Sequence, residues 1–505
     1  MRPNRINVKF RKRIKASEPG LQKRKQHRPM NKDDLTTGPI ALHFHALAIP
    51  AAFGMLFATL YNIVDVYYAG LLSTDAQAGL AIGYQAIFIF LALGFGLSSA
   101  LSALISNAKG SGDGKLTQRL IAQGLTFSVI ITVFSIILGW FIGPNLIGLV
   151  SEPGSYRDAA LGYFQWLIFA LPGFLIAYGG NGVLQAHGDN RSMQRALMAA
   201  FVANIGINPL LMFGLPNIWS GIGFNGIAAA TIVSQTGVMV YVVFRILQLQ
   251  IMQSVKLPAF IPRKDSFKQI LKFLLPASSA LLIMFVATFV IQFSLKSFGG
   301  HAVAGYGVAL RIEQILLLPV LGMTGALLPI AGQNFGALKF DRVRDAFKYC
   351  WSVGFMMTAI AAPLLLFGGH FAISIFSSDP EVIEAGSSYL RIDAFLFPFY
   401  MMLFAINSLL HAFKQAVWTF WISIYRQGFG VAFFIWLFIS CFGFDLQGVW
   451  FGIAIAVVTG WALSLTIALH VGRKEMGGLL SSVVPISDSK KHSNQPVNRK
   501  SKDSF

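Results

Sequence analysis

The amino-acid sequence predicts an all-α polytopic membrane protein in which twelve transmembrane helices form two six-helix lobes. Three observations predict this fold class: the composition, the length of the apolar segments and an internal repeat. Of the 505 residues, 55% are hydrophobic and only 12% are charged, whereas a soluble domain carries about 25% charged residues. The apolar blocks are about 20 to 28 residues long, which suffices for a tilted helix to cross a hydrocarbon core of roughly 30 Å.

The apolar blocks predict where each helix lies. Polar or glycine-rich segments separate them, and continuous runs of this length argue against the short alternating strands of a membrane barrel. The predicted spans are 43–69, 79–106, 120–143, 160–184, 194–214, 224–246, 270–297, 304–332, 348–372, 386–410, 417–440 and 447–471.

Basic residues in the loops predict the direction of the spans, because Lys and Arg accumulate on the cytoplasmic side of a membrane. Both terminal segments are strongly basic. If these segments lie in the cytoplasm, five loops are also cytoplasmic, and each of them carries net positive charge: 107–119, 187–195, 255–272, 338–348 and 411–415. The opposite loops are mostly neutral or acidic. We therefore expect a multi-pass protein of the bacterial inner membrane with both termini in the cytoplasm.

The first two spans of each half match at an offset of 226 residues without a gap, and the same offset places "NGVLQA" (181–186) over "NSLLHA" (407–412). Matched pairs include Pro50 with Pro276, "AQAG" (76–79) with "AVAG" (302–305), "GLSSAL" (96–101) with "GMTGAL" (322–327), and Gly110 with Gly336. An even number of spans in each repeat preserves orientation, so the lobes are related by an axis along the membrane normal, as in transporters with parallel repeats.

The repeat and the composition together predict five segments. They are a basic cytoplasmic tail at 1–40, an N-lobe at 41–246, a cytoplasmic linker at 247–269, a C-lobe at 270–471 and a cytoplasmic tail at 472–505. The basic clusters of the tails are expected to be solvated segments that orient the protein and bind no specific ligand. Because they adjoin membrane spans, anionic lipid is favoured over nucleic acid as a surface that they could contact.

Asp65 is the acidic residue within the first apolar block, in "LYNIVDVYYAG" (60–70). Its equivalent in the second half is Ile291, so the carboxylate is not a common requirement of lobe architecture. An ionised carboxylate in a bilayer is costly unless it faces a cavity or a partner. Burial favours the neutral form and a bound cation favours the charged form, so one such acid can couple ion flow to transport. A satisfied structural acid is the alternative reading.

Several motifs in order resemble the multidrug and toxic compound extrusion (MATE) family, over about residues 40–470. They are Pro50, Asp65 and Gly70 in the first span, "NGVLQAHGD" (181–189), "NIGINP" (204–209), "GIAAAT" (226–231) and "LLPIAGQNFGA" (327–337). The resemblance implies export of amphipathic or cationic drugs driven by inward flow of protons or sodium ions, by a monomer that uses no cofactor. It agrees with the absence of a phosphate-binding GxxxxGK motif followed by Ser or Thr.

The resemblance also implies a cation site. It maps onto Asp65, Asn204, Asn208 and Thr231. Their hard oxygens suit an exchanging proton or a sodium ion, although asparagines in membrane helices also join helices structurally. Where some members have a second acid before the proline, this chain has Asn208, and the seventh span has no acid. Loss of that charge weakens a sodium site more than a proton site. We therefore expect a proton, and a position closer to the DinF-like branch.

The drug chamber is expected to be apolar with a few polar groups. Candidate wall residues, each with packing as its alternative role, are Met55, Phe57, Tyr61, Asn62, Asn181, Gln185, Met284 and Phe285. Two further charged sets, Arg311 with Glu313 and Arg391 with Asp393, are expected either to pair across helices or to handle substrate or protons.

Other functions fit the sequence less well. A lipid-linked oligosaccharide flippase of the same wider fold group is the main alternative, but its pyrophosphate favours a more cationic cavity. A passive channel does not explain the duplicated lobes with one intramembrane Asp. An enzyme is not expected, because no nucleophile with its base and no metal cluster is visible. Cys350 and Cys441 lie far apart in apolar segments, so neither a disulfide framework nor a zinc site is indicated.

Overall fold

The structure of the protein is a computed structural model that describes residues 34–215 and 217–480. The basic clusters predicted at the two chain ends lie outside the described residues. The helices of the first half are α2 (Ile40–Leu72), α3 (Thr74–Gly110), α4 (Gly114–Val150), α5 (Ser155–Leu167), α6 (Leu171–Ala186), α7 (Arg191–Phe213) and α8 (Asn225–Leu247). Those of the second half are α9 (Lys264–Lys296), α10 (Gly300–Gly336), α11 (Phe340–Ser374), α12 (Pro380–Asp393), α13 (Phe397–Ala412), α14 (Ala416–Ser423), α15 (Val431–Trp436) and α16 (Leu446–Met476).

The described residues contain eleven helical segments long and apolar enough to span a membrane, and twelve when the bent pair α12 and α13 counts as one span. The predicted all-α, polytopic fold is therefore confirmed. Most helices extend several residues beyond their apolar blocks, and α3 and α4 each begin at a side-chain cap. Ser73 accepts a hydrogen bond from the Ala76 N–H at the start of α3, and Asp113 accepts one from the Leu116 N–H at the start of α4.

Two spans predicted as continuous helices are broken, and both breaks occupy equivalent positions of the repeat. The break between α5 and α6 is a 3₁₀ turn at Ile168–Ala170, and α12 and α13 meet at an angle of 59°. Pro172 and Pro398 follow the two breaks in the first turn of the next helix. Proline lacks an N–H and its ring clashes with the carbonyl four residues earlier, so an α-helix cannot run through it unperturbed.

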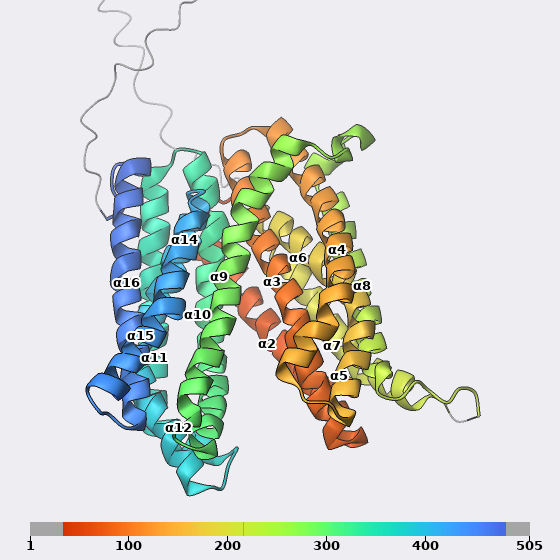
Figure 1. Ribbon diagram of the computed structural model, residues 1–505. Helices are drawn as coiled ribbons and strands as arrows, with labels where there is room; N and C mark the ends of the chain where they lie inside the picture. Colours follow the sequence, from red (N-terminus) through yellow and green to blue (C-terminus); the bar gives the residue numbers. More distant parts are fainter. Residues whose placement is uncertain (1–33, 216, 481–505) are drawn as a thin grey trace, which may run out of the picture.

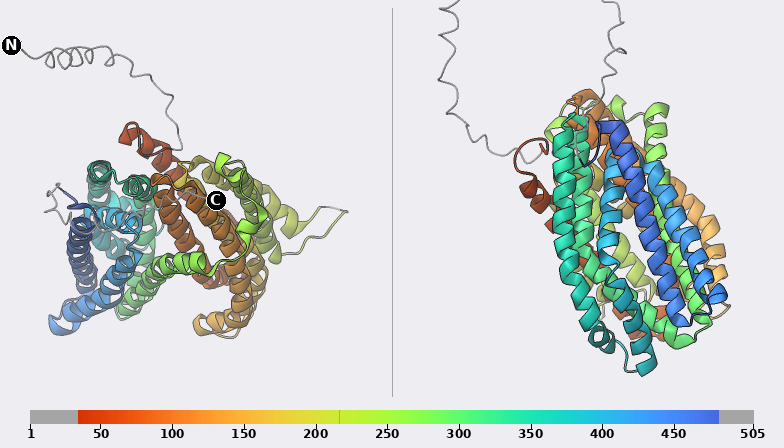
Figure 2. Two further views of the ribbon diagram at one scale, coloured as in Figure 1. Left: turned by 90° about the horizontal axis from the view of Figure 1, so that it is seen from above. Right: turned by 90° about the vertical axis from the view of Figure 1, so that its left-hand side faces the viewer.

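Helices α2–α8 and α9–α16 form two bundles that lie side by side (Figures 1 and 2). We call them the N-lobe and the C-lobe. The N-lobe has two buried apolar clusters and the C-lobe has one large cluster centred on α10, α11 and α13. Helix α2 takes part in both lobes. Phe44 and Leu47 near its start belong to the C-lobe cluster, whereas Tyr61 and Ala69 farther along belong to the N-lobe clusters.

The linker between the lobes is attached to the N-lobe. It contains two 3₁₀ turns, Gln250–Met252 and Leu257–Phe260. The buried side chain of Gln123 on α4 donates to the carbonyls of Ala259 and Ile261 at 2.7 and 2.8 Å and accepts from the Arg263 N–H at 2.8 Å. These bonds place the start of α9 beside α4, six residues before the predicted start of the seventh span.

The lobes meet at the face where α2 begins and α16 ends, which we call the terminal face. The loop after α6 lies there, and so do the ends of α3, α10 and α13. On the opposite side a cleft of about 290 Å³ opens between α3 and α9. Its lining residues are Ala81, Ile82, Tyr84, Gln85, Phe88 and Phe285, and we call it the outer cleft.

Acid is expected to destabilise the terminal face through His187, which is buried directly after α6. Burial, reinforced by the charge of Lys109, lowers the pKa of His187 to about 4. The unfolded chain therefore binds more protons than the folded one between pH ~6.5 and ~4, and stability falls by up to about 3 kcal/mol as the pH drops through that window. The thermal midpoint in detergent checks this: its fall on acidification should be shallower for His187→Gln. Identical pH slopes would contradict the assignment.

Candidate functional site

Asp65 lies inside the N-lobe, where α2 packs against α7 and α8. Its side chain points into the lobe and is only 3% exposed. Helix α7 presents Asn204 and Asn208 on the same face because they are one turn apart, and α8 supplies Thr231. All four side chains are buried, so three helices bring together the predicted cluster.

Hydrogen bonds connect the members of this cluster directly. Asn208 Nδ2 donates to Asp65 Oδ1 at 2.8 Å and lies 3.0 Å from Asn204 Oδ1. Thr231 Oγ1 donates to Asp65 Oδ2 at 3.3 Å. The hydroxyl of Tyr61, one helical turn before Asp65, donates to Thr231 Oγ1 at 3.2 Å. Tyr61 therefore belongs to the acid cluster, whereas the sequence suggested it for the wall of the drug chamber.

Several buried polar atoms around Asp65 make no hydrogen bond among the described residues. They are Asn204 Nδ2, Asn208 Oδ1 and Ser234 Oγ. Buried polar groups are normally satisfied by protein or water, so these atoms have the capacity for a further hydrogen-bond partner. A sodium ion would require the amide oxygen of Asn208 to face Asp65, which takes a half-turn of that amide group. A proton on the carboxyl group requires no such rearrangement.

The remaining chamber candidates do not gather around one cavity. Phe285 lines the outer cleft and its ring lies 5.4 Å from that of Phe88. Phe57 packs against Phe201 at 5.7 Å. Met55 and Met284 are exposed. Their roles in binding stay predictions.

The predicted polar residues of the chamber differ in burial. Asn62 and Gln185 are half-buried, whereas Asn181 is buried and its Oδ1 makes no hydrogen bond among the described residues. The repeat equivalent Asn407 on α13 has the same unpaired oxygen. An amide oxygen in this situation is suited to accept a hydrogen bond from a ligand. The role of Asn181 in binding stays a prediction.

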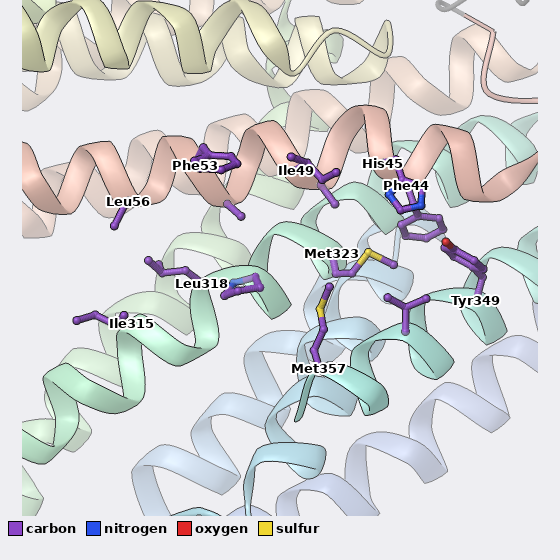
Figure 3. Close-up of a pocket in the computed structure, with 14 residues that line it drawn as sticks. Phe44, His45, Ile49, Phe53, Leu56, Ile315, Leu318, Met323, Tyr349 and Met357 are labelled. Carbon is purple, nitrogen blue, oxygen red and sulfur yellow. The ribbon is translucent and has the colours of Figure 1, made fainter. Parts of the chain in front are cut away.

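A second cavity of about 390 Å³ lies between α2 of the N-lobe and α10 and α11 of the C-lobe (Figure 3). Ile49 and Phe53 of α2 face Leu318 and Met323 of α10, and Met357 of α11 lies beneath them. The lining is almost wholly apolar, and Asp65 is not part of it. The ion-coupling candidates and this apolar pocket are thus separate features.

The C-lobe contains a second acidic cluster. Glu313 of α10 and Asp393 of α12 are both buried, and Tyr389 Oη donates to Glu313 Oε2 at 2.7 Å. Neither oxygen of Asp393 accepts a well-formed hydrogen bond from any described residue. Tyr306 and Trp450 enclose Tyr389 with ring centroids 5.1 Å away. The sequence singled out these acids but did not show that they meet.

The sequence predicts that these two sets pair across helices or handle substrate or protons, and among the described residues no ion pair joins either acid to an arginine. Arg391 contacts Glu384 at 3.5 Å, and Arg311 is exposed. In both sets the arginine precedes the acid by two residues, which places the side chains about 200° apart around the helix. The acid therefore points into the lobe when the arginine points out of it.

None of the three buried acids has an acidic equivalent in the other half of the repeat. The positions that match Asp65, Glu313 and Asp393 are occupied by Ile291, Ile87 and Leu167, all of which are buried apolar core residues. Each lobe thus carries its own charged cluster on a common helical framework.

The MatE family model matches the chain twice, at residues 50–210 and 276–436. The two matches stand at the offset of the internal repeat. Among curated relatives, a probable multidrug resistance protein of Bacillus subtilis, YpnP, is 27% identical over 393 residues, which are 76% of this chain and 85% of that protein. The multidrug export protein MepA of Staphylococcus aureus is 24% identical over 70% of this chain and 76% of its own length.

Other relatives differ in what their names say they transport. An FAD transporter of Shewanella oneidensis is 24% identical over 72% of this chain and 80% of its own length. Among solved structures, a MOP superfamily transporter from Pyrococcus furiosus superposes with a TM-score of 0.80 at 21% identity, over 88% of this chain and 98% of that one. A second, described as the outward-facing conformation of a MATE family transporter, gives 0.78 at 22% identity over 88% and 99%. These likenesses show a common fold.

Proposed function

The chain belongs to the MatE family, and from this premise we propose that it is a cation-coupled efflux antiporter for amphipathic and cationic drugs. Two lobes with a cleft between them suit alternating access, in which one lobe rocks against the other around a binding site. Relatives named as multidrug resistance and multidrug export proteins support drugs as the cargo. The observation that carries the proposal is Asp65, a buried acid with uncompensated polar neighbours.

We propose the proton as the coupling ion. The cluster around Asp65 offers one carboxylate, and its nearest neighbour is the amide of Asn208. Protonation needs a single carboxylate, whereas a sodium ion in a low-dielectric site gains more from two. When the cavity opens to water, the charged form of Asp65 is favoured. When it closes, the neutral form is favoured. The proton therefore binds when the site opens to the side of higher proton activity, stays bound while the site is closed, and leaves when the site opens to the side of lower proton activity.

We propose that the terminal face is cytoplasmic and that the protein lies in the bacterial inner membrane. The loops at the terminal face include 111–113, 187–190 and 337–339, which adjoin basic residues such as Lys109, Arg191 and Lys339. Loops on the opposite side, such as 375–379 and 442–445, carry acids instead. This asymmetry is the one expected when positive loops stay inside.

Dye transport into everted membrane vesicles tests the proposed activity. A proton gradient, acid inside, and a sodium gradient are imposed separately, and accumulation of a fluorescent cationic dye is followed. We expect accumulation with the proton gradient and none with sodium alone. Accumulation that follows only sodium would overturn the coupling ion. Absence of driven accumulation for every cationic dye tried would overturn the efflux activity itself.

We propose that the C-lobe acids also take part in proton or substrate handling. The alternative is a structural role, and the two differ in what Asp393→Asn does. Asp393 lacks a well-formed hydrogen bond among the described residues, and burial of an unpaired carboxylate opposes folding. We therefore expect Asp393→Asn to keep or raise the thermal midpoint in detergent while driven efflux falls about tenfold. A lower midpoint together with unchanged efflux per folded protein would favour the structural role.

A further inference from the structure

Two buried amide side chains join the lobes at the terminal face. Asn107, in the last turn of α3, donates from Nδ2 to the carbonyl of Ala412 at 2.9 Å. Gln333, in the last turn of α10, donates from Nε2 to the carbonyl of Ala186 at 2.7 Å. Asn107 is 3% exposed and Gln333 is 1% exposed. Each bond runs from one lobe to the other.

The two bonds are equivalent under the internal repeat. Asn107 and Gln333 are separated by 226 residues, and so are their acceptors Ala186 and Ala412. Each acceptor is the last residue of a helix, α6 or α13. The final carbonyls of a helix have no intrahelical donor. Each lobe thus uses an amide to cap the end of a helix in the other lobe.

The backbones of α3 and α10 approach closely beside these bonds. A Cβ atom on Gly110 would lie 1.9 Å from the carbonyl oxygen of Gln333, and a Cβ on Gly336 would lie 2.1 Å from that of Asn107. These glycines are also repeat equivalents, and each ends its helix. Glycine at both positions is what allows the two helix ends to touch.

A further contact between the lobes lies on the same side, where Ser99 Oγ of α3 lies 2.6 Å from His411 Nδ1 of α13. Gln333 Oε1 also accepts from the N–H of Leu35 at 2.9 Å, and Leu35 belongs to the C-lobe cluster. The outer cleft lies on the other side, between α3 and α9. These contacts therefore join the lobes at the terminal face, and the outer cleft opens on the opposite side.

We propose that Asn107 and Gln333 form a two-fold latch that holds the cytoplasmic side closed and so sets the balance between outward-open and inward-open states. The inference rests on the alternating access proposed above. Admitting cargo from the terminal face requires the ends of α3 and α10 to separate, which breaks both bonds together. The latch residues are positioning residues, because they contact neither Asp65 nor the outer cleft.

The chemistry of the latch suits a contact that opens in every cycle. A neutral hydrogen bond contributes modestly, because water replaces it when the partners separate. Each bond is expected to shift the equilibrium between the two states by about fivefold, and the pair by about twenty-five-fold if they are independent. A buried ion pair at this place would leave two unpaired charges on opening, which is far more costly.

Labelling of single cysteines by a membrane-impermeant maleimide tests the latch. Cys350 and Cys441 are first replaced by alanine. One reporter, Ser106→Cys on α3, is buried beside Gly332 of the C-lobe, and the other, Gln85→Cys, lines the outer cleft. In everted vesicles the reagent reaches the terminal face, where the Ser106→Cys reporter lies. In right-side-out vesicles it reaches the outer cleft, which the Gln85→Cys reporter lines.

We expect Asn107→Ala and Gln333→Ala each to raise the labelling rate of the Ser106→Cys reporter about fivefold, and the double variant about twenty-five-fold. The rate at the Gln85→Cys reporter should fall in the same variants, because the two states exclude each other. Asn107→Gln and Gln333→Asn, which keep the amide, should return both rates part of the way to the parent values. Loss of packing alone would instead raise both rates.

A control is Thr132→Val. Thr132 is equally buried and donates from Oγ1 to the carbonyl of Ser128 at 2.7 Å, a bond that lies within α4 of the N-lobe. This variant should leave both labelling rates within about twofold of the parent. The latch is overturned if the double variant leaves both rates unchanged, if both rates rise together, or if Thr132→Val produces the same reciprocal change.

Gly110→Ala offers an independent route to the same state, because its added Cβ meets the Gln333 carbonyl only when the terminal face is closed. We expect the same reciprocal change in labelling. Gly114→Ala, where nothing lies within 4 Å of the added atom, is its control. Neither experiment uses a drug or an ion gradient. Failure of proton-coupled efflux would therefore leave the latch intact, and an unchanged labelling pattern would leave the efflux activity intact.

Discussion

Asp65→Asn is expected to abolish gradient-driven efflux while the protein remains folded and inserted. The amide has the shape of the carboxyl group and can still accept a hydrogen bond from Thr231, but it cannot take up or release a proton. Removal of a buried carboxylate without a counter-charge does not destabilise the lobe. Dye accumulation in everted vesicles should fall to the level of vesicles without the protein, and the thermal midpoint in detergent should stay equal or rise.

The control for this experiment is Asp113→Asn. Asp113 is an exposed acid that caps α4 at the terminal face, and asparagine caps a helix equally well. It should transport like the parent. Uphill dye accumulation by Asp65→Asn at the parental rate would show that the coupling proton binds elsewhere, and the C-lobe pair of Glu313 and Asp393 would then be the first place to look.

Asn208→Asp is expected to make transport sensitive to sodium. The substitution places a second carboxylate at the position whose amide now lies 2.8 Å from Asp65. Two carboxylates at this distance cannot both ionise without a cation, so they either share a proton or bind a metal ion. Hard oxygen ligands suit sodium, and the neighbouring oxygens of Asn204 and Thr231 can complete its coordination. The apparent affinity for sodium should rise at least about tenfold.

Sodium dependence of dye accumulation at fixed pH measures this effect. Asn181→Asp is the matched control, since it adds a buried acid to the same lobe on α6, outside the hydrogen-bonded cluster of Asp65. It should not create a sodium response. If Asn208→Asp and the parent respond to sodium alike, the charge of the cluster does not select the ion, and the argument for a proton loses its basis.

The N-lobe cluster was predictable because its residues combine two kinds of information. Asp65 is an acid in an apolar span, which is visible in the sequence alone. The one-turn spacing places Asn204 and Asn208 on one face, and the family resemblance implied Thr231. Tyr61 was missed as a member because a tyrosine in a membrane helix has many roles, and only the packing of α2 on α8 brings its hydroxyl to Thr231.

Other features depend on contacts that sequence periodicity does not encode. The apolar blocks predicted the spans, but they did not show that the helices break just before Pro172 and Pro398. The meeting of Glu313 with Asp393 depends on the crossing of α10 and α12. Asn107 and Gln333 look like ordinary amides near helix ends, and their partners are backbone carbonyls, which leave no trace in side-chain identity.

Helix α2 cannot move as a simple part of either lobe. Its first turns pack into the C-lobe cluster, and its later turns carry Asp65 into the N-lobe. In the proposed alternating-access cycle, one of these two interfaces has to slip when the bundles reorient, or α2 has to bend near Pro50. The proposed protonation of Asp65 would then be connected to the interface between the lobes through the continuous backbone of α2.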